Sequence, residues 1–182
     1  MVFPPTPDPA SVRAPAARPQ RAARIIEGQR RAIAFVFAFA ALSIIAALHT
    51  WLSSIVVVGS LAGSVVVAFG MPESDMARSR SLLGGHAISC IAGIVVSHVL
   101  RDSSLAGPVG VSIALLLMQS TATIHSPAGA DPLIILACKG DWWRPVLVLL
   151  LGLLLISLLA QGYRRITAAL EGTQPPDGTA SP

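Results

Sequence analysis

The chain is poor in charged residues, in aromatic residues and in cysteine. Charged residues make up 12% of its 182 positions and aromatic residues 5%, whereas soluble domains carry about 25% charged residues. The two cysteines form no Cys-x-x-Cys motif, so we expect no disulfide. Neither metal-ligand spacing nor a nucleophile–base pair stands out, so we expect no metal, no cofactor and no enzymatic activity. The shortage of charge excludes an ordinary soluble protein.

Apolar sequence takes the place of charge. Hydrophobic residues make up 53% of the chain and concentrate between residues 32 and 163. We therefore expect an all-α integral membrane protein, with the lipid bilayer as its main partner. Its transmembrane domain should cover residues 31–165. Residues 1–30 should form a disordered basic tail and residues 166–182 a disordered C-terminal tail, because neither can bury a core.

The apolar sequence divides into runs of two lengths. Four runs are long enough for a membrane span of about 20 residues, and they cover residues 32–51, 84–100, 106–124 and 145–163. Two further segments, 52–70 and 128–138, are interrupted or short. In residues 52–70, the small residues Gly59–Ser64 indicate either close helix packing or a broken, re-entrant segment. We expect about four transmembrane helices plus two short segments, and five or six crossings if the short segments also cross.

Arginine gathers ahead of the first apolar run. Six of the thirteen basic residues lie there: Arg13, Arg18, Arg21, Arg24, Arg30 and Arg31. Such a cluster is typical of a cytoplasmic anchor beside anionic lipid. We therefore expect the inner (plasma) membrane of a bacterium, with both termini cytoplasmic. Nucleic-acid binding is not expected, because this tail lacks aromatic residues and any known binding module, and a homo-oligomer is left open.

The central stretch between two apolar runs, residues 125–133, reads HSPAGADPL. It combines an ionisable histidine with helix-breaking prolines, where lipid tolerates neither unless protein or water covers them. The alternative is a short polar loop between two ordinary spans. We predict that His125 and Gly129 face a water-filled cavity. Gly85 and His86, which open another span, are candidates to line the same path.

Residues 125–130, HSPAGA, resemble the motif of the HPP family of integral membrane proteins, in which His-Pro-Pro is usually followed by Ala-Gly-Ala. Ser126 replaces the first proline, and Asp131-Pro132 replaces small or apolar residues. The resemblance also includes the proline-containing connection into Gly84–His86 and the Trp-containing return after residue 138. It covers about residues 32–163. The family is described as having four membrane-spanning helices, and some members, notably in plant chloroplasts, are associated with nitrite transport.

The resemblance implies a transporter or channel for a small inorganic anion, with nitrite as the favoured substrate, acting passively or coupled to protons. A broken helix starting near Ala128 and Gly129 would offer unpaired N–H groups to the anion. Asp131 would repel an anion unless it is protonated or paired. The alternative is a non-transporting membrane scaffold or assembly protein. The expected pathway residues are His125, Ser126, Pro127, Gly129, Asp131, Gly85 and His86.

Overall fold

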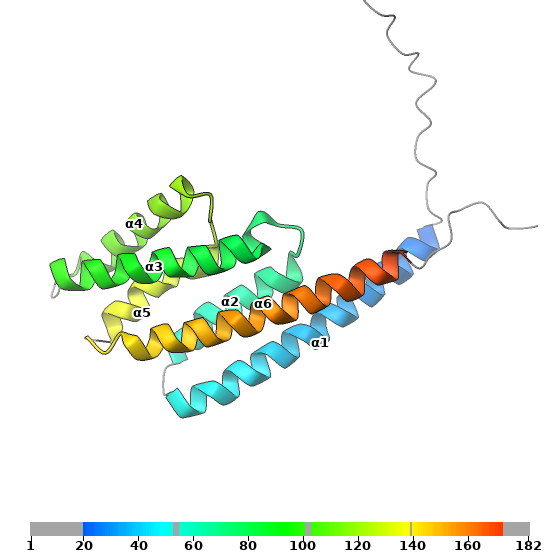
Figure 1. Cartoon of the computed structure of the whole chain (residues 1–182), viewed down its shortest axis with the longest axis horizontal. Coiled ribbons are helices and arrows are strands. Elements are labelled where there is room, and N and C mark those ends of the chain that lie inside the picture. Colours follow the sequence, from blue (N-terminus) through cyan, green and yellow to red (C-terminus); the bar gives the residue numbers. More distant parts are fainter. Residues whose placement is uncertain (1–19, 53–54, 101–102, 139, 173–182) are drawn as a thin grey trace, which may run out of the picture.

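The computed structural model describes residues 20–52, 55–100, 103–138 and 140–172, and within these ranges all regular structure is helical. This confirms the all-α class expected from the sequence. The six α-helices and two 3₁₀-helices are α1 (Gln20–Leu52), α2 (Ile55–Gly70), η2 (Asp75–Ala77), α3 (Ser79–Val99), α4 (Ala106–Ser120), η3 (Ser126–Ala130), α5 (Asp131–Ala137) and α6 (Trp143–Gly172) (Figure 1).

Three helices are long and apolar enough to cross a bilayer, and the candidate spans within them are Ala23–Ala47 of α1, Ser79–Val99 of α3 and Trp143–Gly172 of α6. Helices α2 and α4 are apolar but shorter, with 16 and 15 residues. At 1.5 Å per residue they rise about 24 and 22 Å, less than the hydrocarbon thickness of roughly 30 Å. The protein is thus an integral membrane protein with long and short apolar helices.

Helices α1 and α6 run side by side and continue together beyond the rest of the bundle (Figure 1). Residues 20–30 and 166–172 belong to these helices. The disordered tails expected over residues 1–30 and 166–182 were therefore predicted too long. Each extension is packed: Ile26 is buried on α1 and Thr167 on α6. Residues 1–19 and 173–182, the remainder of the expected tails, lie outside the described residues.

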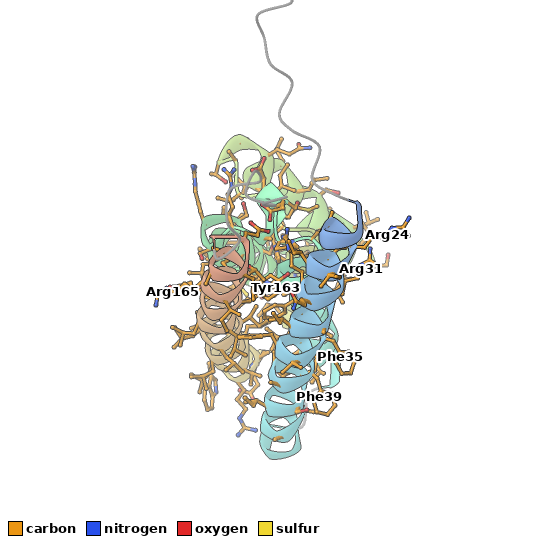
Figure 2. All side chains as sticks on the ribbon, turned by 90° about the vertical axis from the view of Figure 1, so that its right-hand side faces the viewer. Arg24, Arg31, Phe35, Phe39, Tyr163 and Arg165 are labelled. Carbon is orange, nitrogen blue, oxygen red and sulfur yellow. The ribbon has the colours of Figure 1, made fainter. Side chains whose placement is uncertain are left out.

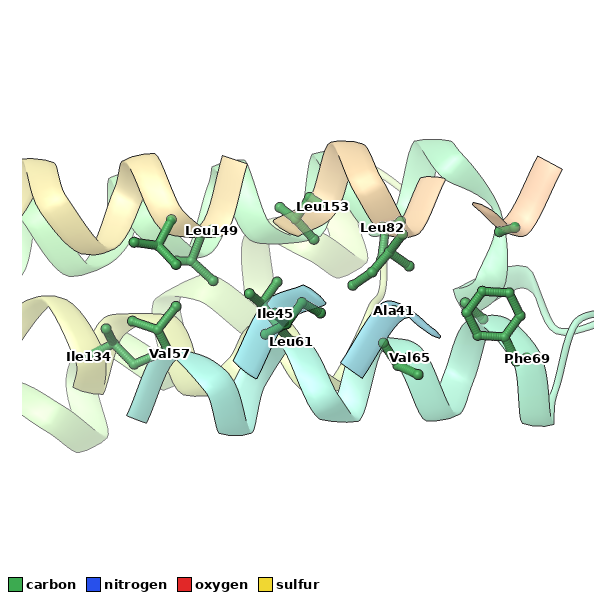
Figure 3. Close-up of a cluster of buried hydrophobic side chains, with 14 of the residues drawn as sticks. Ala41, Ile45, Val57, Leu61, Val65, Phe69, Leu82, Ile134, Leu149 and Leu153 are labelled. Atoms are coloured by element: carbon green, nitrogen blue, oxygen red, sulfur yellow. The ribbon is translucent and has the colours of Figure 1, made fainter. Parts of the chain in front are cut away.

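The main apolar core lies between α1, α2 and α6 (Figure 3). Ala41 and Ile45 of α1 face α2 there and are at most 1% exposed. Leu61 of α2 fits against Gly152 of α6, where an added Cβ would lie 2.5 Å from the Leu61 Cδ1 atom. Glycines such as Gly152 let apolar helices approach closely in lipid, where no hydrophobic effect drives the helices together.

The outer faces of the helices remain apolar. Phe35 and Phe39 of α1 are 70% and 64% exposed, and their rings stack with centroids 6.2 Å apart. Figure 2 shows both rings pointing away from the bundle, with Arg24 and Arg31 nearer the N-terminal end of the same helix. Exposed aromatic rings on a long apolar helix suit a surface that faces lipid.

The two short apolar segments expected from the sequence differ in structure. The first forms one continuous helix, α2, whereas the second is divided between η3 and α5. Gly59–Ser64 does not interrupt α2, which agrees with the packing interpretation of these small residues. On α2, Gly63 allows Pro127 to approach, since an added Cβ would lie 3.1 Å from the Pro127 Cβ. Helix α4 ends at Ser120, earlier than the expected residue 124, and Ala122 follows with a φ of 52°. The chain then returns into the bundle as η3 and α5.

Candidate functional site

Five polar side chains meet inside the apolar bundle, and we call them the central network. Each is at most 4% exposed. They come from four separate segments: Ser60 and Ser64 from α2, His86 from α3, His125 from the residue before η3, and Asp131 from the start of α5. In a membrane protein, buried ionisable groups of this kind are expensive and commonly mark an ion or proton pathway.

Local sequence explains how each segment presents its side chain. Ser60 and Ser64 are four residues apart and so lie on one face of α2. Asp131 occupies the first turn of α5, where a carboxylate is favoured, and Pro132 fits the same turn because it needs no N–H partner. His125 precedes η3 in extended backbone, with a φ of −140° and a ψ of 101°.

The carboxyl group of Asp131 has partners on both oxygens. His86 Nδ1 lies 2.6 Å from Asp131 Oδ2, and the Ser60 hydroxyl donates to Asp131 Oδ1 at 2.9 Å. The same Ser60 oxygen is 3.2 Å from the carbonyl of Pro127, and Cys90 Sγ is 3.8 Å from Asp131 Oδ2. The requirement that Asp131 be protonated or paired is therefore met, since an imidazole stands against it.

Ser64 joins the two histidines. Its Oγ atom lies 2.9 Å from His86 Nε2 and 3.0 Å from His125 Nε2, and the ring centroids are 5.1 Å apart. The Ser64 hydroxyl can also donate to the Ser60 carbonyl, at 3.1 Å. On the far side of its ring, His125 Nδ1 lies 2.8 Å from the Met76 carbonyl oxygen in η2. The network thus runs without interruption from Asp131 to η2.

Two glycines of α3 let the central stretch approach. At Gly85, an added Cβ would lie 2.8 Å from the His125 Cβ and 3.0 Å from the Thr123 carbonyl oxygen. At Gly93, it would lie 2.8 Å from the Cα of Pro132. Real Cβ atoms essentially never come within 3.0 Å of another atom, so the two 2.8 Å distances exclude a side chain unless the neighbouring atoms shift. Glycine at these positions holds the backbone around His125 and Asp131 against α3.

The structure brings together most of the residues expected from the sequence. His125, His86 and Asp131 are in the network, and Gly85 and Pro127 contact it. The other two members of the expected set differ. Ser126 is exposed and lies outside the network. Gly129 is half-buried, and an added Cβ there would meet no atom within 4 Å.

The expected open cavity at His125 is not seen in this conformation. The His125 side chain is 0% exposed, and both ring nitrogens have protein partners. The expected unpaired N–H groups also differ: the Ala128 N–H donates to the His125 carbonyl at 3.0 Å. Packing by α2, α3 and η2 closes over the histidine, so an ion would need a rearrangement to reach it.

Sequence reasoning missed Ser60 and Ser64 as site residues, because it interpreted them only as part of a small-residue segment that is either closely packed or re-entrant. Their spacing of four within an apolar helix was the available signal, because it places two hydroxyl groups on one face. The Met76 carbonyl carried no signal at all. Its role depends on the turn that follows α2 and not on its side chain.

The order Asp131, His86, Ser64 matches that of a serine hydrolase triad, in which histidine joins an acid to a hydroxyl. Ser64, however, is 0% exposed, and its oxygen contacts two imidazoles and a carbonyl. In this conformation these groups enclose the Ser64 hydroxyl. In the part of the chain that the structure describes, no group of three or more His, Cys, Asp or Glu residues is placed to hold a metal ion.

Comparisons with known proteins agree with this architecture. The chain is 34% identical over 121 residues to one transmembrane protein of Dictyostelium discoideum, covering 60% of this chain and 42% of that protein. A second transmembrane protein of the same organism is 32% identical over 123 residues, covering 62% of this chain and 40% of its own length. The matches thus span less than half of these relatives. No solved structure matches the chain. The model of the HPP transmembrane region matches residues 24–171, and the chain therefore belongs to the HPP family of transmembrane proteins.

Proposed function

We propose that this protein is a transporter or channel for a small inorganic anion, with nitrite as the favoured substrate. We place it in the inner membrane of a bacterium, with both termini in the cytoplasm. The observation that carries the proposal is the central network, a set of protonatable side chains buried among apolar helices. Such groups are costly in a membrane and are usually retained for ion or proton movement.

The charges of the network are compatible with an anion. His86 Nδ1 lies 2.6 Å from Asp131, so a proton on the imidazole balances the negative charge of the carboxylate within the site. His125 and His86 present ring nitrogens that donate hydrogen bonds when protonated. Serine hydroxyl groups beside them supply further donors. A small anion that displaced one of the internal contacts would find N–H and O–H groups in its place.

The backbone around the network supports the same proposal. Between the end of α4 at Ser120 and the start of α5 at Asp131 the chain is not α-helical. Irregular backbone at membrane depth is tolerated only where protein or water covers it. Transporters commonly form their substrate sites from such discontinuous helices. Here α2 and α3 cover the irregular segment through Gly63 and Gly85.

One observation favours the alternative function, a non-transporting scaffold or assembly protein. In the described conformation every ring nitrogen of His86 and His125 has a partner within the protein. A fully hydrogen-bonded network is also what a purely structural role requires, because it fixes the helices in one arrangement. The scaffold function predicts a bundle that is impermeable to anions in reconstituted vesicles.

The experiment is anion flux in proteoliposomes with a panel of nitrite, nitrate, formate and chloride. Gly129→Val is the informative variant, because an added Cβ there meets no atom within 4 Å and the side chain enters the space beside the central stretch. Gly59→Val is the matched control, since an added Cβ on α2 also meets no atom within 4 Å. We expect selective flux that Gly129→Val reduces and Gly59→Val does not. Absence of flux for every anion would overturn the proposal.

A further inference from the structure

The hydrogen bonds of the central network determine how many protons it must hold. The Met76 carbonyl can only accept, so His125 Nδ1, 2.8 Å away, carries a proton. In a neutral imidazole the other nitrogen then has a lone pair. His125 Nε2 therefore needs a donor, and the Ser64 hydroxyl at 3.0 Å is its neighbour.

Ser64 has a single proton. The Ser60 carbonyl, 3.1 Å away, does not need it, because it already accepts the helical N–H of Ser64 within α2. Giving the Ser64 proton to His125 then decides the state of His86. His86 Nε2 lies 2.9 Å from the same Ser64 oxygen, so it must donate an N–H to that oxygen. The remaining nitrogen of His86 faces Asp131 at 2.6 Å. Either that nitrogen is also protonated beside a carboxylate, or it accepts from a protonated Asp131. In both cases the pair holds one proton more than a neutral imidazole beside a carboxylate.

A second arrangement satisfies the same contacts. With the extra proton on His125, its Nε2 donates to Ser64, the Ser64 hydroxyl donates to His86 Nε2, and His86 Nδ1 donates to Asp131. The two arrangements interconvert in one balanced step: His125 Nε2 gives its proton to the Ser64 oxygen, and Ser64 gives its own proton to His86 Nε2. No atom is left over and the hydroxyl is restored.

Removing the extra proton is costly. Two lone pairs, on His86 Nε2 and His125 Nε2, would then compete for the one Ser64 hydroxyl, and one buried acceptor would stay unsatisfied. The set would also carry an unbalanced negative charge on Asp131 inside an apolar bundle.

From this geometry we infer that Asp131, His86, Ser64 and His125 form a proton relay that holds one exchangeable proton and moves it together with the transported anion. The coupling rests on the proposed function. The anion meets a neutral set of side chains when the proton is present and a negative set when it is absent. Proton and anion therefore each raise the affinity for the other, as linkage requires.

The surroundings of the relay allow exchange at one end. From α3, Cys90 lies 3.8 Å from Asp131 Oδ2. The opposite end of the relay is His125, which contacts η2, where Asp75 and Arg78 are exposed. From α2 the relay meets the hydroxyl group and the carbonyl of Ser60, neither of which is charged. In this conformation the relay thus exchanges its proton on the side of η2, and release on the opposite side needs the same rearrangement that admits the anion. Glu73, two residues before η2, pairs with Arg30 of α1 on the side expected to be cytoplasmic.

The proton count has a direct test in the full-length protein. Nitrogen-15 and carbon-13 magnetic resonance of protein reconstituted in lipid at neutral pH reports the protonation of each imidazole nitrogen and of the Asp131 carboxyl. Spectra of Asp131→Asn and His125→Gln assign the signals. We expect one proton more than two neutral imidazoles and a carboxylate. A count of two neutral imidazoles beside an ionised Asp131 would overturn the inference, whether or not any anion is transported.

The coupling is tested by recording luminal pH during nitrite uptake in proteoliposomes, after subtraction of the signal from protein-free vesicles. Potassium and valinomycin hold the membrane potential at zero. We expect the lumen to acidify as nitrite enters, and Ser64→Ala to slow acidification by about ten-fold or more, as expected when a charge-assisted hydrogen bond is lost. Ser89→Ala, a buried serine outside the relay, is the matched control and should acidify normally.

The outcomes of these tests separate the two proposals. Nitrite uptake without proton entry, or normal acidification in Ser64→Ala, would contradict the relay and leave anion transport standing. Absence of uptake for every anion would contradict the proposed function and with it the coupling, while the magnetic-resonance count would still decide whether the relay holds its proton.

Discussion

Two clusters of ionisable side chains in this molecule each join a basic group to an acidic one by a hydrogen bond. One cluster is exposed to solvent, and the other is buried in the bundle. At one end of α1 and α6, Arg30 binds Glu73 and Glu171, each at 3.0 Å. The side chains of Arg30, Glu73 and Glu171 are 26%, 86% and 44% exposed. In the bundle interior, His86 binds Asp131 at 2.6 Å, and these side chains are 1% and 0% exposed.

The difference lies in what surrounds each pair. Water screens the Arg30 cluster, and exposed ion pairs contribute about 0–1 kcal/mol. The His86–Asp131 pair has no such screening, so a charge on either partner interacts strongly with its surroundings and is costly to leave unpaired. The exposed cluster therefore ties the ends of two helices together, whereas the buried pair responds to any change in its proton or its partner. We therefore place the proposed transport function at the buried pair.

The largest expected effect is that of Asp131→Ala. It removes the partner of His86 Nδ1 and of the Ser60 hydroxyl, and breaking a buried ion pair costs about 3–5 kcal/mol. The midpoint of thermal unfolding in detergent should fall sharply, and less for Asp131→Asn, which keeps the volume and an acceptor. An unchanged midpoint for Asp131→Ala would show that the pair does not stabilise the bundle.

His125→Ala should come next. It removes the hydrogen bonds to the Met76 carbonyl and to Ser64, and each buried group left without a partner costs about 1–3 kcal/mol. The neighbouring Ser126→Ala is the control, because that side chain is exposed and outside the network. The same unfolding measurement applies. Equal stability of the two variants would contradict the burial of His125.

Gly85→Ala tests the close approach of α3 to the central stretch. The added methyl group would lie 2.8 Å from the His125 Cβ, and overpacking of this kind costs about 1–3 kcal/mol. Gly59→Ala, where the methyl group meets no atom within 4 Å, should be neutral or stabilise α2 by up to about 1 kcal/mol. The unfolding midpoint should fall for Gly85→Ala and stay level or rise for Gly59→Ala, and a similar fall in both variants would contradict the packing.

The smallest effect is expected at the exposed cluster. Arg30→Ala loses both glutamate partners, yet the free energy of unfolding should change by about 1 kcal/mol or less, because water screens these charges. Salt should weaken the wild-type contribution further. Unfolding followed at low and high ionic strength measures both. A loss as large as that of Asp131→Ala would remove the contrast between the two clusters.

The sequence predicted the helical class, and it predicted His86, His125 and Asp131 as members of one site, because ionisable residues stand out in apolar runs. Ser60 and Ser64 were missed because small hydroxyl residues are common in packed membrane helices. The contact of Ser64 with His125 joins residues 61 positions apart, and tertiary packing sets such pairs. The helical extensions of α1 and α6 escaped prediction for the same reason, since Arg30 and Glu171 are 141 positions apart.

The most direct test of the account compares two isosteric removals of a carboxylate, Asp131→Asn in the buried pair and Glu73→Gln in the exposed cluster. Initial rates of nitrite uptake are measured in proteoliposomes that contain equal amounts of folded protein. We predict that Asp131→Asn lowers the rate by about ten-fold or more, as expected for a lost charge-assisted hydrogen bond, and that Glu73→Gln stays near wild type. A normal rate for Asp131→Asn, or a greater loss for Glu73→Gln, would contradict the claim that transport depends on the central network.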